Sequence, residues 1–355
     1  MERLLGIFVQ AQEAQRTLEL LRRMKLQLNG FRFHRVGEEV GIPLVRLPSA
    51  QDENMLRTEL EDFRIQETSF EPALSRPRNL RDAVRAIVPP NLLSDLPRSL
   101  DVVGDIAILE ISPRLEPYSL EVGKGILQVN PHVRLVLKKT SDVTGAFRTR
   151  GLQVLAGSGG METIHREFGC DYHLDTSSVY FNPRLAHERL RVAAQAAADD
   201  VVVDMFAGVG PYSILIAKLQ PHSTVYALDI NPSAIKYLKE NILANGVADR
   251  VVALLGDARV LSRSVLQGTA DRVVMNLPSE AEHYLDAACQ ILKPAKSYIH
   301  FYRFAPRGVN LDSVKDDFER SVLSQNRKIR TFSYCDVVRE ISPRRVQIAI
   351  DALVK

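Results

Sequence analysis

The segment from residue 200 to residue 211, DVVVDMFAGVGP, constrains the fold of this chain more than any other. An apolar run typical of a strand ends at Asp204, passes into a turn that contains Gly208 and Gly210, and continues into a helical sequence. In open α/β sheets, ligands bind beyond the carboxyl ends of the strands, and glycines there let a ligand press against bare backbone. The segment therefore predicts the first strand and the ligand-binding turn of an α/β domain.

The sequence of this turn, AGVGP, favours S-adenosylmethionine over a dinucleotide. A dinucleotide site needs GxGxxG so that a pyrophosphate rests on a helix N-terminus, whereas Pro211 has no N–H group to donate. The carboxylate of Asp204 would repel a diphosphate and attract the ammonium group of a methionine moiety. A turn this short also occurs in variant dehydrogenases and in plain strand-turn-helix units, so other segments must decide.

Strand-like and helical segments alternate from about residue 187 onward, which predicts a mostly parallel sheet. The expected strands are VVVDM, TVYALDI, VVALLGD, DRVVMNL and SYIHFYR. We therefore expect an α/β domain over residues 187–355, preceded by two smaller α+β domains. The first, residues 1–66, contains an amphipathic helix and a hairpin; a polar linker follows over 67–78, and a mixed, β-rich domain over 79–186.

Acidic residues end two further predicted strands and extend the cofactor pattern. Asp229 closes TVYALDI about 20 positions after the glycine turn, where a carboxylate can accept hydrogen bonds from both ribose hydroxyls. Asp257 closes the third strand, where it can accept a hydrogen bond from the adenine amino group. Either residue alone could simply cap a helix. Carboxylates at three successive strand ends favour an adenosine site.

The fourth predicted strand ends in Asn276-Leu277-Pro278. Enzymes that methylate nitrogen commonly have an Asn or Asp followed by prolines at this position, because a rigid turn can aim an amide and a carbonyl at a target base. The alternative is an ordinary turn in which asparagine tolerates unusual dihedral angles. Its place at the strand end favours the first interpretation.

Four segments, VYFNPRLAHER, VVVDMFAGVGP, ALDINPSAI and MNLP, resemble in this order the archaeal and eukaryotic-type tRNA (guanine-N1)-methyltransferases, which act on guanosine 37 beside the anticodon. The resemblance extends from about residue 147 to the C-terminus and includes DVVGDIAILEIS at 101–112, whereas residues 1–66 match only in size and general pattern. It implies a small domain that checks the outer corner of tRNA, a middle domain, and a class I, Rossmann-like S-adenosylmethionine-dependent methyltransferase domain. It also suggests a monomer.

The resemblance implies roles for individual residues. Glu188 resembles the family's general base, Arg148 its catalytic arginine, and Asn276 the asparagine of its N-L-P motif. Asn182 stands where serine is more common, a departure that leaves the functional residues intact. The candidate cofactor-binding residues are Arg189, Asp204, Phe206, Gly208, Asp229, Ile230, Asp257, Ala258 and Asn276.

Guanine N1 carries a proton at neutral pH, so its methylation needs a base. Our hypothesis is that Glu188 takes this proton while Arg148, with Asn276, stabilises the negative charge that develops on O6. Arg189 is expected to point toward the cofactor and to leave Glu188 free for the base. The scheme needs no metal, and no cluster of His, Cys and Asp has the spacing of a metal site.

Three alternatives remain at this stage. A sibling enzyme of wyosine synthesis transfers the aminocarboxypropyl group of the same cofactor, but such relatives lack N-L-P at the fourth strand. A bifunctional enzyme that also methylates a wyosine precursor is compatible with the sequence. A catalytically inactive RNA-binding protein is disfavoured because Glu188, Arg148 and Asn276 are all present.

Charge and hydrophobicity define the partners and the compartment that we expect. The net charge of +3 is mild, but arginines cluster at 148 and 150 and at 184, 189 and 191, where they can neutralise phosphates of the anticodon stem-loop. No apolar run approaches the roughly 20 residues that span a bilayer. The N-terminus is charged where a signal peptide would be apolar, so we expect a cytoplasmic protein without membrane contact.

Overall fold

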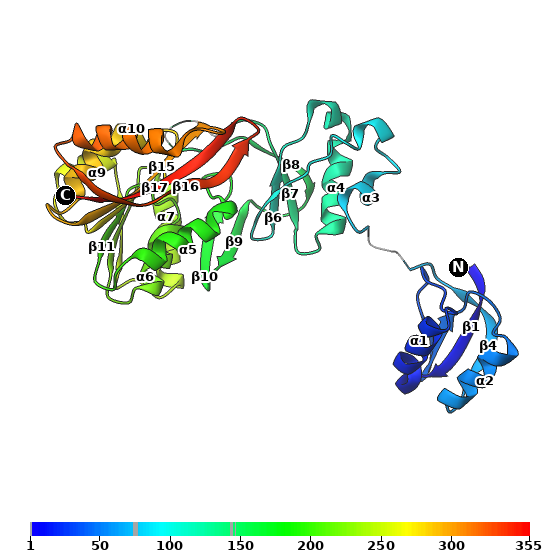
Figure 1. The fold of residues 1–355 in the computed structure, drawn as a ribbon. Helices are drawn as coiled ribbons and strands as arrows, with labels where there is room; N and C mark the ends of the chain where they lie inside the picture. Colours follow the sequence, from blue (N-terminus) through cyan, green and yellow to red (C-terminus); the bar gives the residue numbers. More distant parts are fainter. Residues whose placement is uncertain (1, 74–76, 143–144, 146) are drawn as a thin grey trace. The chain divides into compact units, whose positions relative to one another are not determined.

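The structure is a computed structural model that describes residues 2–73, 77–142, 145 and 147–355. The chain divides into two compact units, Met1–Arg78 and Asn79–Lys355 (Figure 1). No helix within the described residues has both the length and the apolar composition that crossing a membrane requires.

The first unit is a four-stranded antiparallel sheet with two helices. Its strand order is β2-β3-β1-β4. Leu18 and Leu21 of the predicted amphipathic helix pack on Ile7 and Ile42 of the sheet. The predicted hairpin is confirmed as the pair β2–β3. The elements are β1 (Glu2–Gln10), α1 (Ala14–Arg23), β2 (His34–Val36), β3 (Glu39–Pro43), α2 (Ala50–Glu59) and β4 (Arg64–Phe70).

The predicted end of this unit at residue 66 is too early. Strand β4 continues to Phe70, which is fully buried and lies opposite Glu2 of β1. Residues 67–70 of the expected linker are therefore part of the sheet, because backbone pairing with β1 outweighs their polar composition. Residues 74–76 of that linker lie outside the described residues.

The second unit begins with a smaller sheet of order β5-β6-β7-β8. Helices α3 and α4 pack on one face of it through Val84, Val122 and Ile126. Helix α4 was not expected in this β-rich region. The elements are α3 (Leu80–Val84), β5 (Asp101–Val103), β6 (Ile106–Leu109), α4 (Ser119–Val129), β7 (Leu135–Lys139) and β8 (Leu152–Gly157), followed by the hairpin β9 (Glu162–Glu167) and β10 (Cys170–Asp175).

The second unit continues with a seven-stranded sheet of order β13-β12-β11-β14-β15-β17-β16. Strands β11 to β15 are parallel and β17 is antiparallel to both of its neighbours, which confirms the predicted α/β fold. The strands are β11 (Val201–Asp204), β12 (Thr224–Asp229), β13 (Val251–Leu255), β14 (Arg272–Met275), β15 (Ser297–Pro306), β16 (Ile329–Ser342) and β17 (Arg345–Val354). The helices are α5 (Ala186–Gln195), α6 (Pro211–Leu219), α7 (Pro232–Ala244), α8 (Ala258–Arg263), α9 (Leu285–Ile291) and α10 (Leu311–Leu323).

Helices cover both faces of this sheet (Figure 1). Val202 and Val274 point to the face that packs on α5, α6 and α7, whereas Val203 and Val273 point to the face that packs on α9 and α10. This alternation follows from the period of two along a strand. Because β11 to β15 are parallel, their carboxyl ends meet at one edge, where ligands bind in such sheets.

The predicted start of the catalytic domain at residue 187 is too late. The hairpin β9–β10 packs on helix α7, where Asn241 Oδ1 accepts a hydrogen bond from His173 N at 2.7 Å. Asn245 Oδ1 accepts from Asp171 N at 2.9 Å, and Tyr172 is buried among the side chains of α5 and α6. Side chains of α7 thus satisfy backbone groups at the open edge of the hairpin, which joins the catalytic sheet rather than the preceding one.

Candidate active site

The turn after β11 has the backbone geometry that its glycines allow. Gly208 has φ +56° and Gly210 has φ +93°, both in the left-handed region. A Cβ at Gly210 would lie 2.4 Å from Leu238 Cδ1, which would have to shift, and the positive φ would strain any other residue there. A Cβ at Gly208 would instead find only the Tyr180 carbonyl within reach, at 3.7 Å, and would project into open space. The Gly208 backbone is therefore free to face a ligand.

A cavity lies at the carboxyl ends of β11 to β14, and we call it the strand-end cavity. Gly208 and the turns after the neighbouring strands form its wall, and Phe206 contacts Tyr284 edge to face at 5.0 Å. Of the predicted site residues, those that line it are Arg148, Arg189, Phe206, Gly208, Asp229, Ile230, Asp257, Ala258 and Asn276. Asp204 and Glu188 are not among the lining residues.

The carboxylates of Asp229 and Asp257 hold the turns that line this cavity. Asp229 accepts hydrogen bonds from Gly208 N at 2.7 Å and from Asn231 N at 2.8 Å, one to each oxygen. Burial raises the pKa of Asp229. Asp257 caps helix α8 by accepting from Arg259 N at 2.8 Å. The capping interpretation of Asp257 is thus correct, and it does not conflict with a place in the cavity wall.

Asp204 does not line the strand-end cavity and supports the fold beside it. Its side chain is 1% exposed, and its Oδ2 accepts a hydrogen bond from Ser213 Oγ at 2.8 Å, while its Oδ1 has no hydrogen-bond partner among the described residues. The residue ends β11 and holds the start of α6 through Ser213. Burial raises the pKa of Asp204 to about 7.

We expect Asp204→Asn to change how stability depends on pH. The folded protein keeps the Asp204 proton between the ordinary pKa of 3.8 and about 7, whereas the unfolded chain has lost it there. Stability therefore falls as pH rises through this window, by roughly 4 kcal/mol at its upper end. Urea unfolding at pH 5 and pH 8 should show the variant gaining on the wild type at pH 8, while the exposed-site control Asp249→Asn shows no such gain. A difference that is independent of pH would contradict this.

Arg148 and the Asn276-Leu277-Pro278 turn come together in the cavity wall. Arg148 Nη1 donates a hydrogen bond to Ser279 Oγ at 2.6 Å, and the guanidinium lies 5.6 Å from the Tyr180 ring centre. Asn276 Oδ1 is buried and has no hydrogen-bond partner among the described residues. Since buried polar atoms are nearly always paired, this oxygen marks a place where a ligand donor can bind.

Glu188 is buried behind the cavity rather than in its wall. Its Oε1 accepts hydrogen bonds from Tyr302 OH at 2.7 Å and from Arg191 Nη2 at 2.6 Å. Arg191 also pairs with Asp351, whose other oxygen lies 2.7 Å from His300 Nδ1. In this state the carboxylate is thus neutralised within a buried charge network.

Arg189 lines the strand-end cavity, but its guanidinium is already paired with protein groups. Its Nε and Nη2 donate to the two carboxylate oxygens of Glu167 at 2.5 Å each, and its Nη1 donates to the Asn182 carbonyl at 3.1 Å. The side chain is 2% exposed. Arg189 therefore fixes the hairpin β9–β10 to helix α5, and Arg191 is the arginine that lies beside Glu188.

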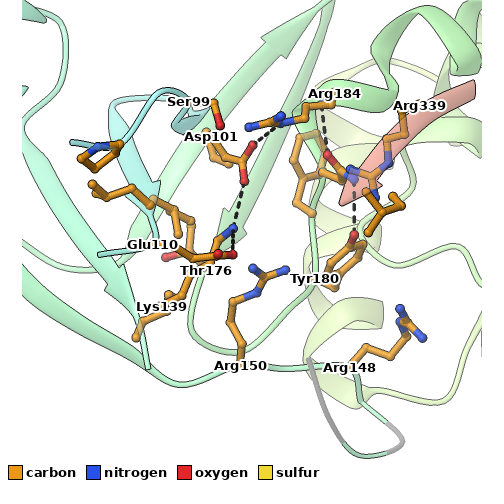
Figure 2. A pocket seen from close by; sticks show the side chains of 18 of the residues that line it. Ser99, Asp101, Glu110, Lys139, Arg148, Arg150, Thr176, Tyr180, Arg184 and Arg339 are labelled. Carbon is orange, nitrogen blue, oxygen red and sulfur yellow. Dashed lines mark hydrogen bonds and ion pairs between the residues drawn. The ribbon is translucent and has the colours of Figure 1, made fainter. Parts of the chain in front are cut away.

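A second cavity opens between the smaller sheet and the catalytic sheet, and we call it the arginine cleft (Figure 2). Arg184 Nε donates to Asp101 Oδ1 at 2.6 Å, and Lys139 lies 3.5 Å from Asp101 and 3.2 Å from Glu110. Arg150 comes from the loop before β8, and its charge lies 5.9 Å from the Tyr180 ring centre. The charged residues that line the cleft are Arg98, Asp101, Glu110, Lys139, Arg148, Arg150, Arg184, Arg339 and Glu340.

The two cavities adjoin, since Arg148, Tyr180 and Arg339 line both. A polyanion in the cleft can therefore present a group to the strand-end cavity. Tyr180 belongs to the VYFNPR segment but was not singled out by the sequence, and Arg339 and Gln347 come from the hairpin β16–β17, which carries no recognisable motif. Within the described part of the chain, no three His, Cys, Asp or Glu side chains are grouped to hold a metal ion.

The strand-end cavity suits an adenosyl group that carries a sulfonium. It offers a half-buried carboxylate at Asp229, a polar cap at Asp257 and apolar surface from Phe206, Ile230 and Ala258. The bare backbone at Gly208 leaves room where a side chain would intrude. These groups match the hydroxyls, the amino group and the ring of adenosine, so the residues present fit the predicted cofactor.

Comparisons with known proteins agree with this geometry. Family models described as the TRM5/TYW2 methyltransferase domain and the TYW2 N-terminal domain match residues 163–330 and 80–160. The tRNA (guanine(37)-N(1))-methyltransferase Trm5b of Pyrococcus abyssi is 40% identical over 94% of this chain and 95% of its own length. The tRNA 4-demethylwyosine(37)-methyltransferase Taw21 of Saccharolobus solfataricus is 33% identical over 72% of this chain and 94% of its own length. A solved complex of aTrm5 with tRNALeu matches 98% of this chain and 99% of that one, with a TM-score of 0.79 and 30% identity.

Proposed function

Because this chain belongs to the TRM5/TYW2 methyltransferase family, we propose that it methylates N1 of guanosine 37 in tRNA and that its two adjoining cavities form the active site. The observation that carries the proposal is the strand-end cavity, where an adenosine-type wall meets the Asn276-Leu277-Pro278 turn and Arg148. Relatives that share most of the chain length carry this activity in their names, which favours it over aminocarboxypropyl transfer.

S-adenosyl-L-methionine is the methyl donor, and its sulfonium makes the methyl group electrophilic. Asp229 would hold the ribose hydroxyls through the oxygen lone pairs that its two backbone bonds leave free. Phe206, Ile230 and Ala258 would pack on the adenine, and Asp257 would accept from its amino group. The protein thereby orients the donor toward the acceptor, which is the main contribution that a methyltransferase makes.

The acceptor nitrogen must lose a proton as the methyl arrives, and Glu188 is the proposed base. Glu188 lies behind the cavity wall in its pair with Arg191, so RNA binding has to release it. Arg191 does not line the arginine cleft and also pairs with Asp351, so the release requires a rearrangement around α5 and not direct competition from a phosphate in the cleft. Arg148 would donate to O6 as negative charge develops there, and Asn276 would accept a hydrogen bond from the base.

The partner is tRNA, and the arginine cleft is the proposed place for the anticodon stem-loop. Six of its charged residues are basic and three are acidic, so it attracts phosphates. We further propose that the first unit contacts the outer corner of the tRNA, and that the chain acts as a cytoplasmic monomer. Light scattering of the free protein and of its tRNA complex would measure their molar masses and test whether the protein is monomeric.

Methyl transfer from labelled S-adenosylmethionine to unmodified transcripts tests the function. We expect label on a transcript with G37, mapped to N1, and none on the same transcript with A37. An isolated anticodon stem-loop should be a poorer substrate than the full tRNA if the first unit contacts the outer corner. Label on neither transcript, with cofactor still bound, would contradict the proposal.

Two further substrates separate the remaining alternatives. The relative from Saccharolobus solfataricus makes a tRNA containing 4-demethylwyosine a useful second substrate, because methylation of both would identify a bifunctional enzyme. Transfer of label from the aminocarboxypropyl carbon, rather than from the methyl group, would identify the sibling activity. Salt-dependent tRNA binding without cofactor binding would identify an inactive RNA-binding protein.

A further inference from the structure

Gln347 carries a buried amide group that the fold leaves unsatisfied. The residue is 1% exposed, and its Oε1 accepts a hydrogen bond from Arg339 Nε at 2.9 Å. Because a guanidinium can only donate, this bond fixes which end of the amide is oxygen. Nε2 is therefore the donor, and it has no hydrogen-bond partner among the described residues. A buried donor without a partner is costly to a fold and is expected where a ligand completes it.

The sheet places Gln347 on the acceptor side of the strand-end cavity. Gln347 of β17 lies opposite Phe304 at the carboxyl end of β15, and Phe304 N donates to the Pro278 carbonyl at 3.2 Å. Gln347 also lines the strand-end cavity. The adenosine-type carboxylate Asp229 ends β12 and Asp257 follows β13, and both strands lie on the far side of β11 in the strand order. The unpaired donor thus belongs with the target base and not with the cofactor.

We propose that Gln347 is a specificity-determining residue that donates a hydrogen bond from Nε2 to the O6 or N7 edge of the target guanine. The proposal rests on the proposed function, and it names a contact for the base that enters the cavity. Arg339 is the positioning residue, since its bond to Oε1 sets the orientation of the amide. Arg339 also lines the arginine cleft, so it connects the RNA surface with the base contact.

The unpaired atoms of the cavity match guanine better than adenine. Gln347 Nε2 is a free donor and Asn276 Oδ1 a free acceptor, and both residues line the same cavity. Guanine presents acceptors at O6 and N7 and donors at N1 and N2. Adenine carries an amino group in place of O6, so its donor would face the donor of Gln347 if O6 is the contact. A buried polar group built to pair with one base discriminates strongly against a base that leaves it unpaired.

The first test removes the donor and keeps the shape of the side chain, although glutamate also adds a negative charge. Gln347→Glu keeps the oxygen that accepts from Arg339 and exchanges the amino group for a second acceptor. We expect kcat/KM for a G37 transcript to fall about 10- to 100-fold, with the KM for S-adenosylmethionine unchanged. The matched control is Gln290→Glu on α9, whose side chain accepts from Ser262 Oγ away from both cavities. A variant with wild-type kcat/KM on G37 would overturn the proposal.

Base analogues separate recognition from a structural effect. Transcripts with 7-deazaguanosine or 6-thioguanosine at position 37 weaken the N7 or the O6 acceptor. If Gln347 donates to that acceptor, the analogue lowers the kcat/KM of the wild type about as much as the substitution lowers it on guanosine. The variant then shows little further loss of kcat/KM on the analogue. If the fold losses in kcat/KM from the substitution and from the analogue multiply for both analogues, the proposal is overturned.

Gln347→Met gives a second variant of similar length if the glutamate does not fold, and the same two analogues apply to it. Failure of the proposed function is distinguished from failure of the Gln347 proposal, because in the first case the wild type itself does not methylate G37. Calorimetric S-adenosylmethionine binding of each variant, compared with the wild type, confirms that the cavity is intact.

Discussion

Replacing Glu188 with glutamine is expected to slow single-turnover methylation of G37 by about 100- to 10,000-fold, the range over which a positioned base contributes. Glutamine has nearly the same shape and can still accept from Tyr302, but it cannot take the N1 proton. Binding of S-adenosylmethionine and tRNA should stay within a few-fold of the wild type. Rapid-quench measurement with saturating cofactor and tRNA separates the chemical step from product release.

The matched control for this substitution is Glu162→Gln. Glu162 also accepts a short hydrogen bond from a tyrosine, Tyr237 OH at 2.6 Å, but it lines neither cavity. Its loss tests the effect of removing a Tyr–Glu contact in general. If Glu188→Gln kept single-turnover rates within about threefold of the wild type, the base would have to be another group.

Replacing Asp229 with alanine is expected to weaken S-adenosylmethionine binding by about 100-fold or more. The variant loses the acceptor proposed for the ribose, and it also leaves Gly208 N and Asn231 N without the carboxylate that holds them. Each hydrogen bond to a charged group contributes about 1.5–3 kcal/mol, so losing the bonds to both ribose hydroxyls would raise the Kd for the cofactor by more than a factor of about 100. Titration calorimetry with the cofactor measures the change.

The control here is Asp249→Ala, because Asp249 is an exposed aspartate that pairs only with its neighbour Arg250 among the contacts described. The tRNA affinity of Asp229→Ala should stay near that of the wild type, since the arginine cleft does not include this residue. A cofactor affinity within threefold of the wild type would show that the ribose is held elsewhere.

The gathering of most predicted cofactor residues around one cavity could be predicted from the sequence because it depends on local order. A βα repeat places the residue after each strand at one edge of the sheet, so Gly208, Asp229 and Asp257 needed no knowledge of distant contacts. Asn276 followed from the same rule. Asp204 and Asp229 both end their strands, yet only Asp229 lines the cavity. The Asp204 side chain instead bonds to Ser213 of α6, a contact that the sequence pattern does not reveal.

The surroundings of Glu188 could not be predicted, because they depend on residues far apart in the sequence. Arg189 pairs with Glu167 of β9, and Arg191 pairs with Asp351 of β17. Helical spacing does place residues 188 and 191 on one face, so Arg191 was the better local candidate for the neighbour of Glu188.

The domain boundary at 187 failed for a similar reason. A short hairpin such as β9–β10 does not reveal from its own residues which sheet it will join. The contacts from Asn241 and Asn245 settle it, and they lie more than 60 residues later in the chain, at separations of 68 and 74 positions. The family model for the methyltransferase domain also begins before this hairpin is complete, at residue 163.

The cofactor half and the acceptor half of the proposed active site come from different parts of the chain. The hairpin β16–β17 contributes only to the acceptor half. Most residues of the wall proposed to meet the cofactor lie between residues 205 and 258, whereas Arg339 and Gln347 lie in the last two strands. Under the role proposed for Gln347, mutations near the C-terminus can change which nucleobase is admitted while the methyl-donor wall stays untouched. A duplicated copy of such an enzyme would then keep its donor site, and changes in this hairpin, together with Arg148 and Asn276, would determine whether it accepts a new base at the same position of tRNA.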